Sequence, residues 1–413
     1  MGVMPMTAVT QPVPTYPMAR ECPFDPPAEL ARIREDECPA GGPGVARVRI
    51  WDGSTPWLVT RYDDVRAALA DERLSADADR QGYPATSRSR HVRSQGRRRS
   101  FIMMDGPEHA RHRRMLIGEF TVRRIERLRP LIEQTVTELL DAMEAGENPT
   151  DLVQAFALPL PSLVICHLLG VPYADHAFFE AQSRIMVDLT SSAEASAAAS
   201  DALQDYLAGL VRARLAEPRD DVLGGMAARV AAGDLTVDEA SASALLLLVA
   251  GHETTANMIA LGTLTLLHHP DQLAAVRDGD ATQVRGAVEE LLRVLTVTHI
   301  GRRRVATEDL EIGGVTIRAG EGVVLAAEAA NRDPRQWPHP DEVDVSRGTN
   351  RHVAFGFGVH QCLGQPLARL ELQIAYPALL RRFPGLRVTV PDSEIAFRDD
   401  MAVYGVHALP VAF

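Results

Sequence analysis

The residue of this chain best suited to chemistry is a cysteine in an unusual setting. The stretch FGFGVHQCLGQPLARLEL, which begins at Phe355, places Cys362 between glycines and just before leucines at helical spacing. Pro366 is tolerated in the first turn of such a helix. We therefore predict that Cys362 lies at a helix N-terminus, where free N–H groups and the helix dipole stabilise a thiolate.

Three kinds of site use such a thiolate: a nucleophile, a zinc ligand, or an axial ligand of a heme iron. A nucleophile needs a base that the sequence does not place, and zinc needs more ligands than the nearby His360. A free cysteine is most often a buried, inert residue. Glycines on both sides, however, are what a thiolate pressed against a flat macrocycle needs.

A second segment with chemical potential is the apolar run LLLLVAGHETTANMIAL. Thr236 and Glu239 form a capping box, which predicts a helix from there to about His268. A Gly, a Glu and two Thr interrupt the apolar pattern of this run. They either weaken the helix locally or form a polar stripe on an exposed side of it. His252 and Glu253 begin H-E-x-x-H, but Ala256 replaces the second histidine and argues against a zinc protease.

The decapeptide F-G-x-G-x-H-x-C-x-G resembles the heme-binding signature of the cytochrome P450 family. The matching residues are Phe355, Gly356, Gly358, His360, Cys362 and Gly364. The resemblance implies heme b as cofactor, with the thiolate of Cys362 as the axial iron ligand. It also implies a mainly α fold with small β-sheets: a large helical body and a smaller β-rich lobe.

The apolar helix resembles the oxygen-binding groove of the same family, [AG]-G-x-[DE]-T-[TS], which begins here at Ala250. Cleaving the O–O bond of the co-substrate O2 needs two protons, delivered without flooding the site with water. The hydroxyl of Thr254 would relay these protons, and the carboxylate of Glu253 would connect the relay to solvent. Electron donation by the thiolate favours the cleavage.

Further motifs of the family supply the surroundings. Glu290 and Arg293 form an E-x-x-R pair on one helix face, and the resemblance implies that Arg347 joins them as a structural scaffold for the cysteine loop. The stretch DGPEHARHRR resembles the family's D-P-P-x-H-x-x-x-R. The residues implied to bind the heme propionates are His109, Arg113, Arg304 and His360.

Along the 413 residues we expect an irregular lead-in at 1–30 and one domain at 31–413. Its β-rich lobe is predicted mainly at 31–70, where Asp52-Gly53 marks a hairpin, at 300–330, and in the C-terminal tail. The polar, arginine-dense stretch 74–100 is predicted to be a long loop. The rest is predicted to be helical.

The composition narrows the partners. The net charge of −12 argues against nucleic acid. No apolar run reaches the roughly 20 residues of a membrane span, and no signal peptide is recognised at the N-terminus. The four scattered cysteines form no C-x-x-C pair, which favours a reduced, cytoplasmic setting. The family resemblance implies a monomer.

The resemblance thus implies a monooxygenase that hydroxylates or epoxidises a lipophilic small molecule such as a macrolide, steroid or drug-like compound. Electrons would come from NAD(P)H through a reductase and a small ferredoxin, with Arg111, Arg114 and Arg351 as candidate docking residues. Two alternatives stay open: a peroxide-driven or oxidative-coupling enzyme on the same fold, which the Glu253-Thr254 pair disfavours, and a heme-binding sensor.

Substrate choice is expected to lie with residues on the distal side of the heme. Most are small or apolar and predict a roomy lipophilic pocket. Two arginines of the 74–100 stretch either belong to a solvated lid or clamp a substrate carboxylate. The candidates are Arg88, Arg90, Leu247, Val297, Ile300, Met401 and Val403.

Overall fold

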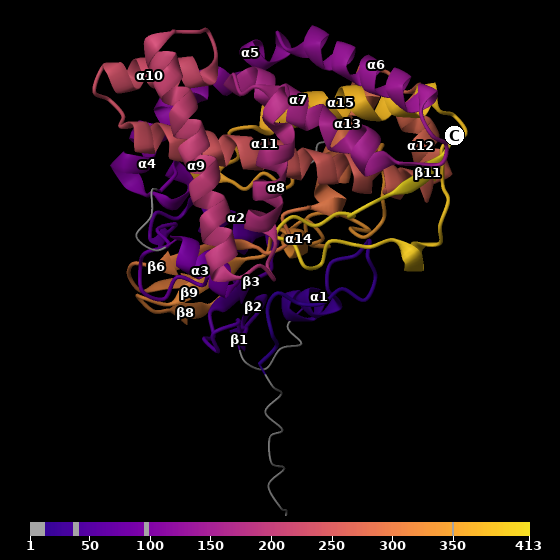
Figure 1. The fold of residues 1–413 in the computed structure, drawn as a ribbon. Coiled ribbons are helices and arrows are strands. Elements are labelled where there is room, and N and C mark those ends of the chain that lie inside the picture. Colours follow the sequence, from indigo (N-terminus) through magenta and orange to yellow (C-terminus); the bar gives the residue numbers. More distant parts are fainter. Residues whose placement is uncertain (1–12, 36–40, 95–98, 349–350) are drawn as a thin grey trace, which may run out of the picture.

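A computed structural model describes residues 13–35, 41–94, 99–348 and 351–413 (Figure 1). Helices dominate it. In chain order they are α1 (Ala28–Arg34), α2 (Tyr62–Ala70), α3 (Arg88–Ser94), α4 (Gly106–Ile117), α5 (Val122–Glu126), α6 (Arg129–Ala145), α7 (Pro159–Leu169), α8 (His176–Val187), α9 (Ala193–Ala216), α10 (Val222–Ala231), α11 (Val237–Leu267), α12 (Pro270–Asp278), α13 (Ala281–Leu295), α14 (Ala327–Ala330) and α15 (Gln365–Arg382). The predicted mainly α fold with small sheets is confirmed.

In the described part of the chain, the strands form three small sheets. The largest has the order β1-β2-β3-β9-β6-β4, a second the order β10-β11-β5, and β7 pairs with β8. The strands are β1 (Gly41–Gly42), β2 (Val45–Arg47), β3 (Trp57–Val59), β4 (Leu74–Ser75), β5 (Thr150–Asp151), β6 (Arg302–Ala306), β7 (Leu310–Ile312), β8 (Val315–Ile317), β9 (Gly322–Leu325), β10 (Arg387–Val388) and β11 (Pro410–Ala412).

The hairpin predicted at Asp52-Gly53 is present, because β2 and β3 pair antiparallel on either side of it and Gly53 has φ 83°. This part of the chain also contains a helix, because residues 62–70 form α2, and the tail strands join β5 in a sheet of their own. Figure 1 shows β11 on the opposite side of the molecule from β1–β3. The lead-in also ends earlier than predicted, since α1 begins at Ala28.

The prediction of one long loop at 74–100 was wrong for part of that stretch. Residues 74–75 form β4, and α3 begins at Arg88 and packs against α9. Hydrogen bonds from the backbone and from Ser192 lower the pKa of Glu194 in the first turn of α9. The positive charge of Arg88 on α3 contributes a smaller part of this lowering. Packing against α9 stabilises α3, and the local composition of this stretch does not encode that tertiary contact. Residues 95–98 lie outside the described part of the chain.

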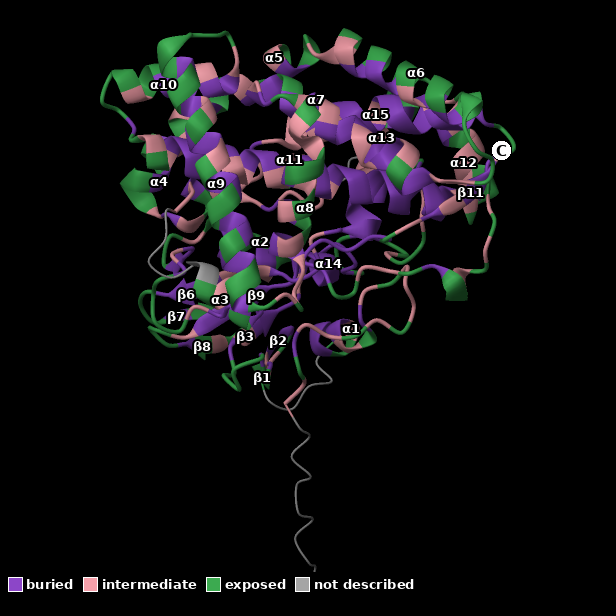
Figure 2. Ribbon diagram, in the orientation of Figure 1, coloured by how far each residue is buried: buried purple, intermediate pink, exposed green. Residues whose placement is uncertain are grey.

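Helix α11 is the centre of the helical body. It begins with the predicted capping box at Thr236 and ends at Leu267, one residue before the expected end. Among the described residues it is the one helix that is long and apolar enough to cross a membrane, by length and composition alone. Of its most apolar stretch of 18 residues, 67% is buried within the protein. It packs against α7, α9 and α15, whereas α6 and α9 expose residues on their outer sides (Figure 2).

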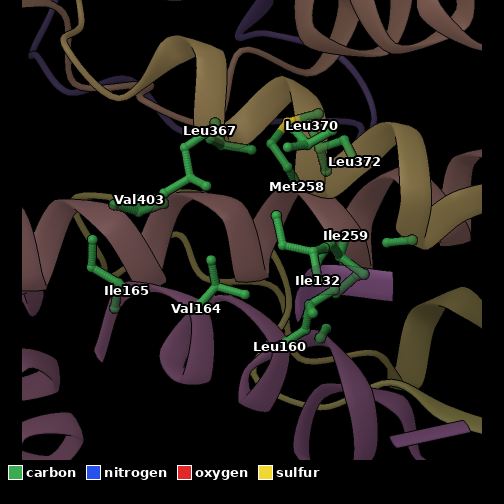
Figure 3. Packing of buried hydrophobic residues seen from close by; sticks show 14 of the residues in the cluster. Ile132, Leu160, Val164, Ile165, Met258, Ile259, Leu367, Leu370, Leu372 and Val403 are labelled. Carbon is green, nitrogen blue, oxygen red and sulfur yellow. The ribbon is translucent and has the colours of Figure 1, made fainter. Parts of the chain in front are cut away.

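A large apolar cluster surrounds α11, with Ile259 of α11, Val164 of α7 and Leu370 of α15 among its members (Figure 3), and a separate cluster packs α2 against the largest sheet. Two close approaches fix this packing. A Cβ on Gly251 would lie 2.8 Å from the Ile165 side chain of α7, and one on Gly262 would lie 2.1 Å from the hydroxyl oxygen of Tyr376 on α15. Glycine at these two positions lets the helices pack directly on α11.

Candidate active site

The cysteine loop is built by glycines in left-handed backbone. Gly356 and Gly358 have φ 70° and 72°, and a Cβ on Gly358 would lie 2.8 Å from the carbonyl oxygen of Leu69 at the end of α2. The amide of Cys362 donates to the carbonyl of Phe355 at 2.8 Å, which closes the loop. Helix α15 then begins, with Gly364 as its N-cap residue. The prediction of a helix directly after Cys362 is confirmed.

Two opposing influences act on the Cys362 thiol. Burial is the larger influence and raises the pKa of the thiol, and the amide of Gly364 and the guanidinium groups of Arg302, Arg113 and Arg369 offset part of this rise. Arg302 is a site residue that the motif missed. In strand β6 alternate residues share a face, so Arg302 lies on the same face as Arg304 and donates to the carbonyl of Ala354 at 3.3 Å. That period-two spacing was the signal that could have found it.

The residues predicted to bind heme propionates converge. The rings of His109 and His360 lie 4.2 Å apart, and Arg113 donates to the carbonyl of Gln361 at 2.6 Å. Burial, with Arg304, His109 and Arg113 nearby, lowers the pKa of His360 to about 3. Burial and Arg113 likewise lower the pKa of His109, whose buried Nε2 has no hydrogen-bond partner within the described residues. An unpartnered ring nitrogen of His109 beside the guanidinium groups of Arg113 and Arg304 suits the carboxylates of a heme.

The middle of α11 carries the only exposed residue in the buried run from Leu247 to Leu261. Ala250 is exposed and Thr254 half-buried, although most of their neighbours are buried. The Thr254 hydroxyl donates to the carbonyl of Ala250 at 2.8 Å, one turn earlier. Ala250 and Thr254 therefore form an accessible patch on a helix that is otherwise mostly buried, and this patch carries a hydroxyl group.

Glu253 belongs to a different face of the same helix. It is buried, and its Oε2 accepts a hydrogen bond from Arg398 at 2.9 Å. His252 is also buried and donates through Nδ1 to the carbonyl of Leu248 at 2.8 Å. Arg398 is a second site residue that the motifs missed, because it lies 145 residues away in the C-terminal tail.

The predicted scaffold is present. Glu290 and Arg293 are both fully buried and lie 2.7 Å apart, and Nε of Arg347 approaches Glu290 to 3.1 Å. Arg293 also donates to the carbonyl of Asn331 at 2.9 Å, and the side chain of Asn331 accepts from the amide of Val353 at 2.8 Å. The pair is thereby linked to the segment that enters the cysteine loop.

The apolar residues predicted to face the substrate are all buried. Ile300 and Met401 form a small cluster with Val187, and Figure 3 shows Val403 next to α11. The arginines lie on α3, where Arg88 is exposed towards the acidic start of α9 and Arg90 is half-buried with partners of its own. The set predicted for the pocket thus divides between Leu247, Val297, Ile300, Met401 and Val403 inside and Arg88 and Arg90 on the outer helix.

Known proteins resemble this chain over nearly its whole length. A model of the cytochrome P450 family matches residues 175–397. Cytochrome P450-SU2 of Streptomyces griseolus is 53% identical, with 97% of each chain covered, and pentalenic acid synthase of Streptomyces avermitilis is 48% identical, with 99% of each covered.

A solved structure agrees. The mycinamicin VIII C21 methyl hydroxylase MycCI of Micromonospora griseorubida, bound to mycinamicin VIII, is 39% identical and superimposes with a TM-score of 0.90 over 97% of this chain and all of its own. Sequence, fold and site therefore agree: the chain belongs to the cytochrome P450 family of heme-thiolate monooxygenases.

Proposed function

We propose that this enzyme binds heme b through Cys362 and inserts one oxygen atom of O2 into a lipophilic small molecule. The observation that carries the proposal is the setting of the Cys362 thiol. It is buried behind left-handed glycines; burial raises its pKa, and the Gly364 amide, Arg302 and Arg113 offset part of that rise. Such an environment suits a thiolate that ligates a metal more than an inert core cysteine.

The remaining residues around the loop fit the same cofactor. Arg113 and Arg304 would neutralise the two propionates, and the neutral rings of His109 and His360 would donate hydrogen bonds to them. Phe355 would cover the sulphur side, held by the Arg369 guanidinium that lies 4.6 Å from its ring centroid. Glu290, Arg293 and Arg347 would keep the loop in place from behind.

When bound, the heme supplies the activation of O2 and the oxidation of the substrate. The chain supplies protons and excludes water. The Thr254 hydroxyl would exchange its bond to Ala250 for one to the oxygen being reduced, and it would pass protons to that atom. Glu253, one residue away and buried, would replenish the proton that Thr254 gives up.

The substrate proposed is a lipophilic small molecule such as a macrolide, steroid or drug-like compound. The buried apolar set Leu247, Val297, Ile300, Met401 and Val403 supports it. The names of two relatives, a pentalenic acid synthase and a mycinamicin hydroxylase, point the same way. The acidic Glu194 on α9, whose pKa Arg88 helps to lower, favours the lid role of the arginines over a substrate clamp.

Electrons would reach the heme from NAD(P)H through a ferredoxin reductase and a small ferredoxin. Of the three docking candidates, Arg111 bonds to Glu239 at 2.7 Å, whereas Arg114 and Arg351 are exposed. We therefore place the docking contact at the latter two. A single domain over 31–413, a monomeric state and a cytoplasmic location complete the proposal.

An absorbance titration of the ferric protein tests the proposal. Neutral and carboxylated lipophiles of matched size are added, and a ligand that displaces distal water shifts the Soret band. We expect neutral ligands to bind at least as tightly as the acids. Clearly tighter acids would instead make Arg88 or Arg90 a clamp. The variant Cys362→Ser should lose the thiolate signature, with Cys22→Ser as the control; an unchanged spectrum would overturn the ligand assignment.

A further inference from the structure

Glu253 is tied to the C-terminal tail by one arginine. The guanidinium of Arg398 donates to its carboxylate at 2.9 Å, and the two side chains are 11% and 7% exposed. The tail is fixed at this point, because the Arg398 amide donates to the carbonyl of Gly405 at 3.0 Å and a Cβ on Gly405 would lie 2.0 Å from Oδ1 of Asn257. Glycine at 405 thus lets the tail press against α11 and bring Arg398 to Glu253.

A cavity of about 30 Å³ lies beside this ion pair, and a cavity of roughly 10–15 Å³ already has room for one water molecule. The polar side chains around it are those of Gln154, Glu180, Arg184, Glu253, Asn257, Arg398 and His407. Within the described residues, the buried Nε of Arg398 has no hydrogen-bond partner. A polar cavity with an unsatisfied donor holds water rather than staying empty.

The cavity reaches from the protein surface to Glu253. Gln154, Arg184 and His407 are exposed and mark its outer end. Its inner wall on α11 consists of Glu253, Ala256, Asn257 and Ala260, which at spacings of three and four residues form one face of the helix. Ala250 and Thr254, also four residues apart, lie on the neighbouring face. Glu253 therefore stands between the water-lined side of α11 and the side that carries Thr254.

We propose that this cavity is the entry route for protons and that Arg398 is a positioning residue that holds Glu253 at its inner end. The inference rests on the proposed role of Glu253 as the proton donor to Thr254. A water in the cavity gives a proton to the Glu253 carboxylate, and the resulting carboxylic acid passes it towards Thr254. One proton enters and one leaves, so the charge of Arg398 and of the pair is restored after each transfer.

The alternative is that Arg398 only holds the tail on α11. Burial alone does not separate these roles, since an arginine bonded to a buried carboxylate stabilises a protein and orients the carboxylate at once. What separates them is whether the effect of Arg398 on proton delivery depends on the presence of the Glu253 carboxylate. A double-mutant cycle measures this dependence.

The experiment compares Arg398→Met, Glu253→Gln and the double variant as holoenzymes, with spinach ferredoxin, its reductase and NADPH, and with progesterone as a neutral lipophilic probe. NADPH consumption is measured in H2O and D2O. We expect Arg398→Met and Glu253→Gln each to slow consumption by about tenfold or more and to raise the solvent isotope effect. The double variant should be no slower than Glu253→Gln. Arg381→Met, an exposed arginine bonded to the carbonyl of Arg277, is the control.

Three further measurements keep the inference testable if Arg398→Met folds poorly. Ala256→Val fills the cavity and leaves the ion pair untouched, so it should slow consumption several-fold and raise the isotope effect without a change in thermal midpoint. Arg398→Lys should recover part of the rate. In thermal unfolding, which needs no turnover, Arg398→Met should lower the midpoint much less in the Glu253→Gln background.

Each outcome decides one point. If Glu253→Gln slows turnover while Arg398→Met and Ala256→Val keep the wild-type rate and isotope effect, protons enter elsewhere and this inference fails while the proposed function stands. If the Arg398→Met and Glu253→Gln effects multiply, Arg398 acts only on structure. If Glu253→Gln itself turns over normally, the proposed role of Glu253 is wrong, which is a separate result.

Discussion

The chemistry at Cys362 depends on neighbours that oppose its burial. A buried thiol beside carboxylates keeps its proton, as Cys166 shows, where burial raises the pKa to about 12 with Glu180 adding to the effect. Burial raises the pKa of Cys362 as well, but there the arginines 302 and 113 act in the opposite direction. These two cysteines thus differ in the charge of their neighbours, and the cations beside Cys362 make it the better suited of the two to bind a metal.

His299 gives a pH prediction at the scale of one residue. Burial, with Arg20 nearby, lowers its pKa to about 4, and its Nε2 donates to the carbonyl of Met401 at 2.8 Å. Because the unfolded chain binds the proton more tightly, this part of the stability is complete above pH 6.5 and is lost as the pH falls towards 4, by roughly 3 kcal/mol. Urea unfolding of His299→Gln should show a weaker loss over that range; an equal loss would contradict the assignment.

At the scale of elements, the contact between α11 and α15 contains a buried carboxyl group. Burial raises the pKa of Glu371 to about 8, and the Thr255 hydroxyl offsets this only in part. The folded state therefore prefers the protonated form, and stability falls as the pH rises from about 4.5 to 8, by roughly 5 kcal/mol. Glu371→Gln should unfold at higher urea than the wild type at pH 8 but not at pH 4.5. A constant difference between the two pH values would contradict this.

The link between α13 and the segment before the cysteine loop depends on Glu290. Glu290→Gln removes the negative charge between Arg293 and Arg347 and leaves a buried cation without a counter-ion. We expect a loss of about 3 kcal/mol in the free energy of unfolding. The neighbouring Glu289→Gln is the control, because Glu289 is partly exposed and its loss should be smaller. Similar losses in the two variants would mean that the buried Glu290–Arg293 pair stabilises the protein no more than the partly exposed pair of Glu289 does.

Local pattern predicted those elements whose own residues determine them. The capping box at Thr236, the turn at Gly53 and the helix after Cys362 all formed where the sequence indicated. Helix α3 was missed because its partner is α9, and Arg302 and Arg398 were missed because only the folded chain brings them to Cys362 and Glu253. Contacts between distant segments carry no local pattern.

At the scale of the whole molecule, the net charge of −12 must be overcome locally for an acidic ferredoxin to dock. Arg114→Glu and Arg351→Glu should therefore raise the KM for ferredoxin by roughly tenfold at low salt and much less at high salt, because screening removes the attraction. Steady-state kinetics measure this. Arg318→Glu, which breaks an exposed pair with Asp309, is the control. No change in KM for either variant would remove the two arginines from the docking surface.

The three-stranded sheet of the tail has a consequence for the folding of the chain. Its central strand, β11, pairs with β5, which lies in the first half of the chain. Pairing between segments so far apart in sequence is slow, because the entropy of closing the long loop is lost before the contacts form. Arg398, Met401 and Val403 precede β11, so we expect the enzyme to acquire these residues of its site late in folding.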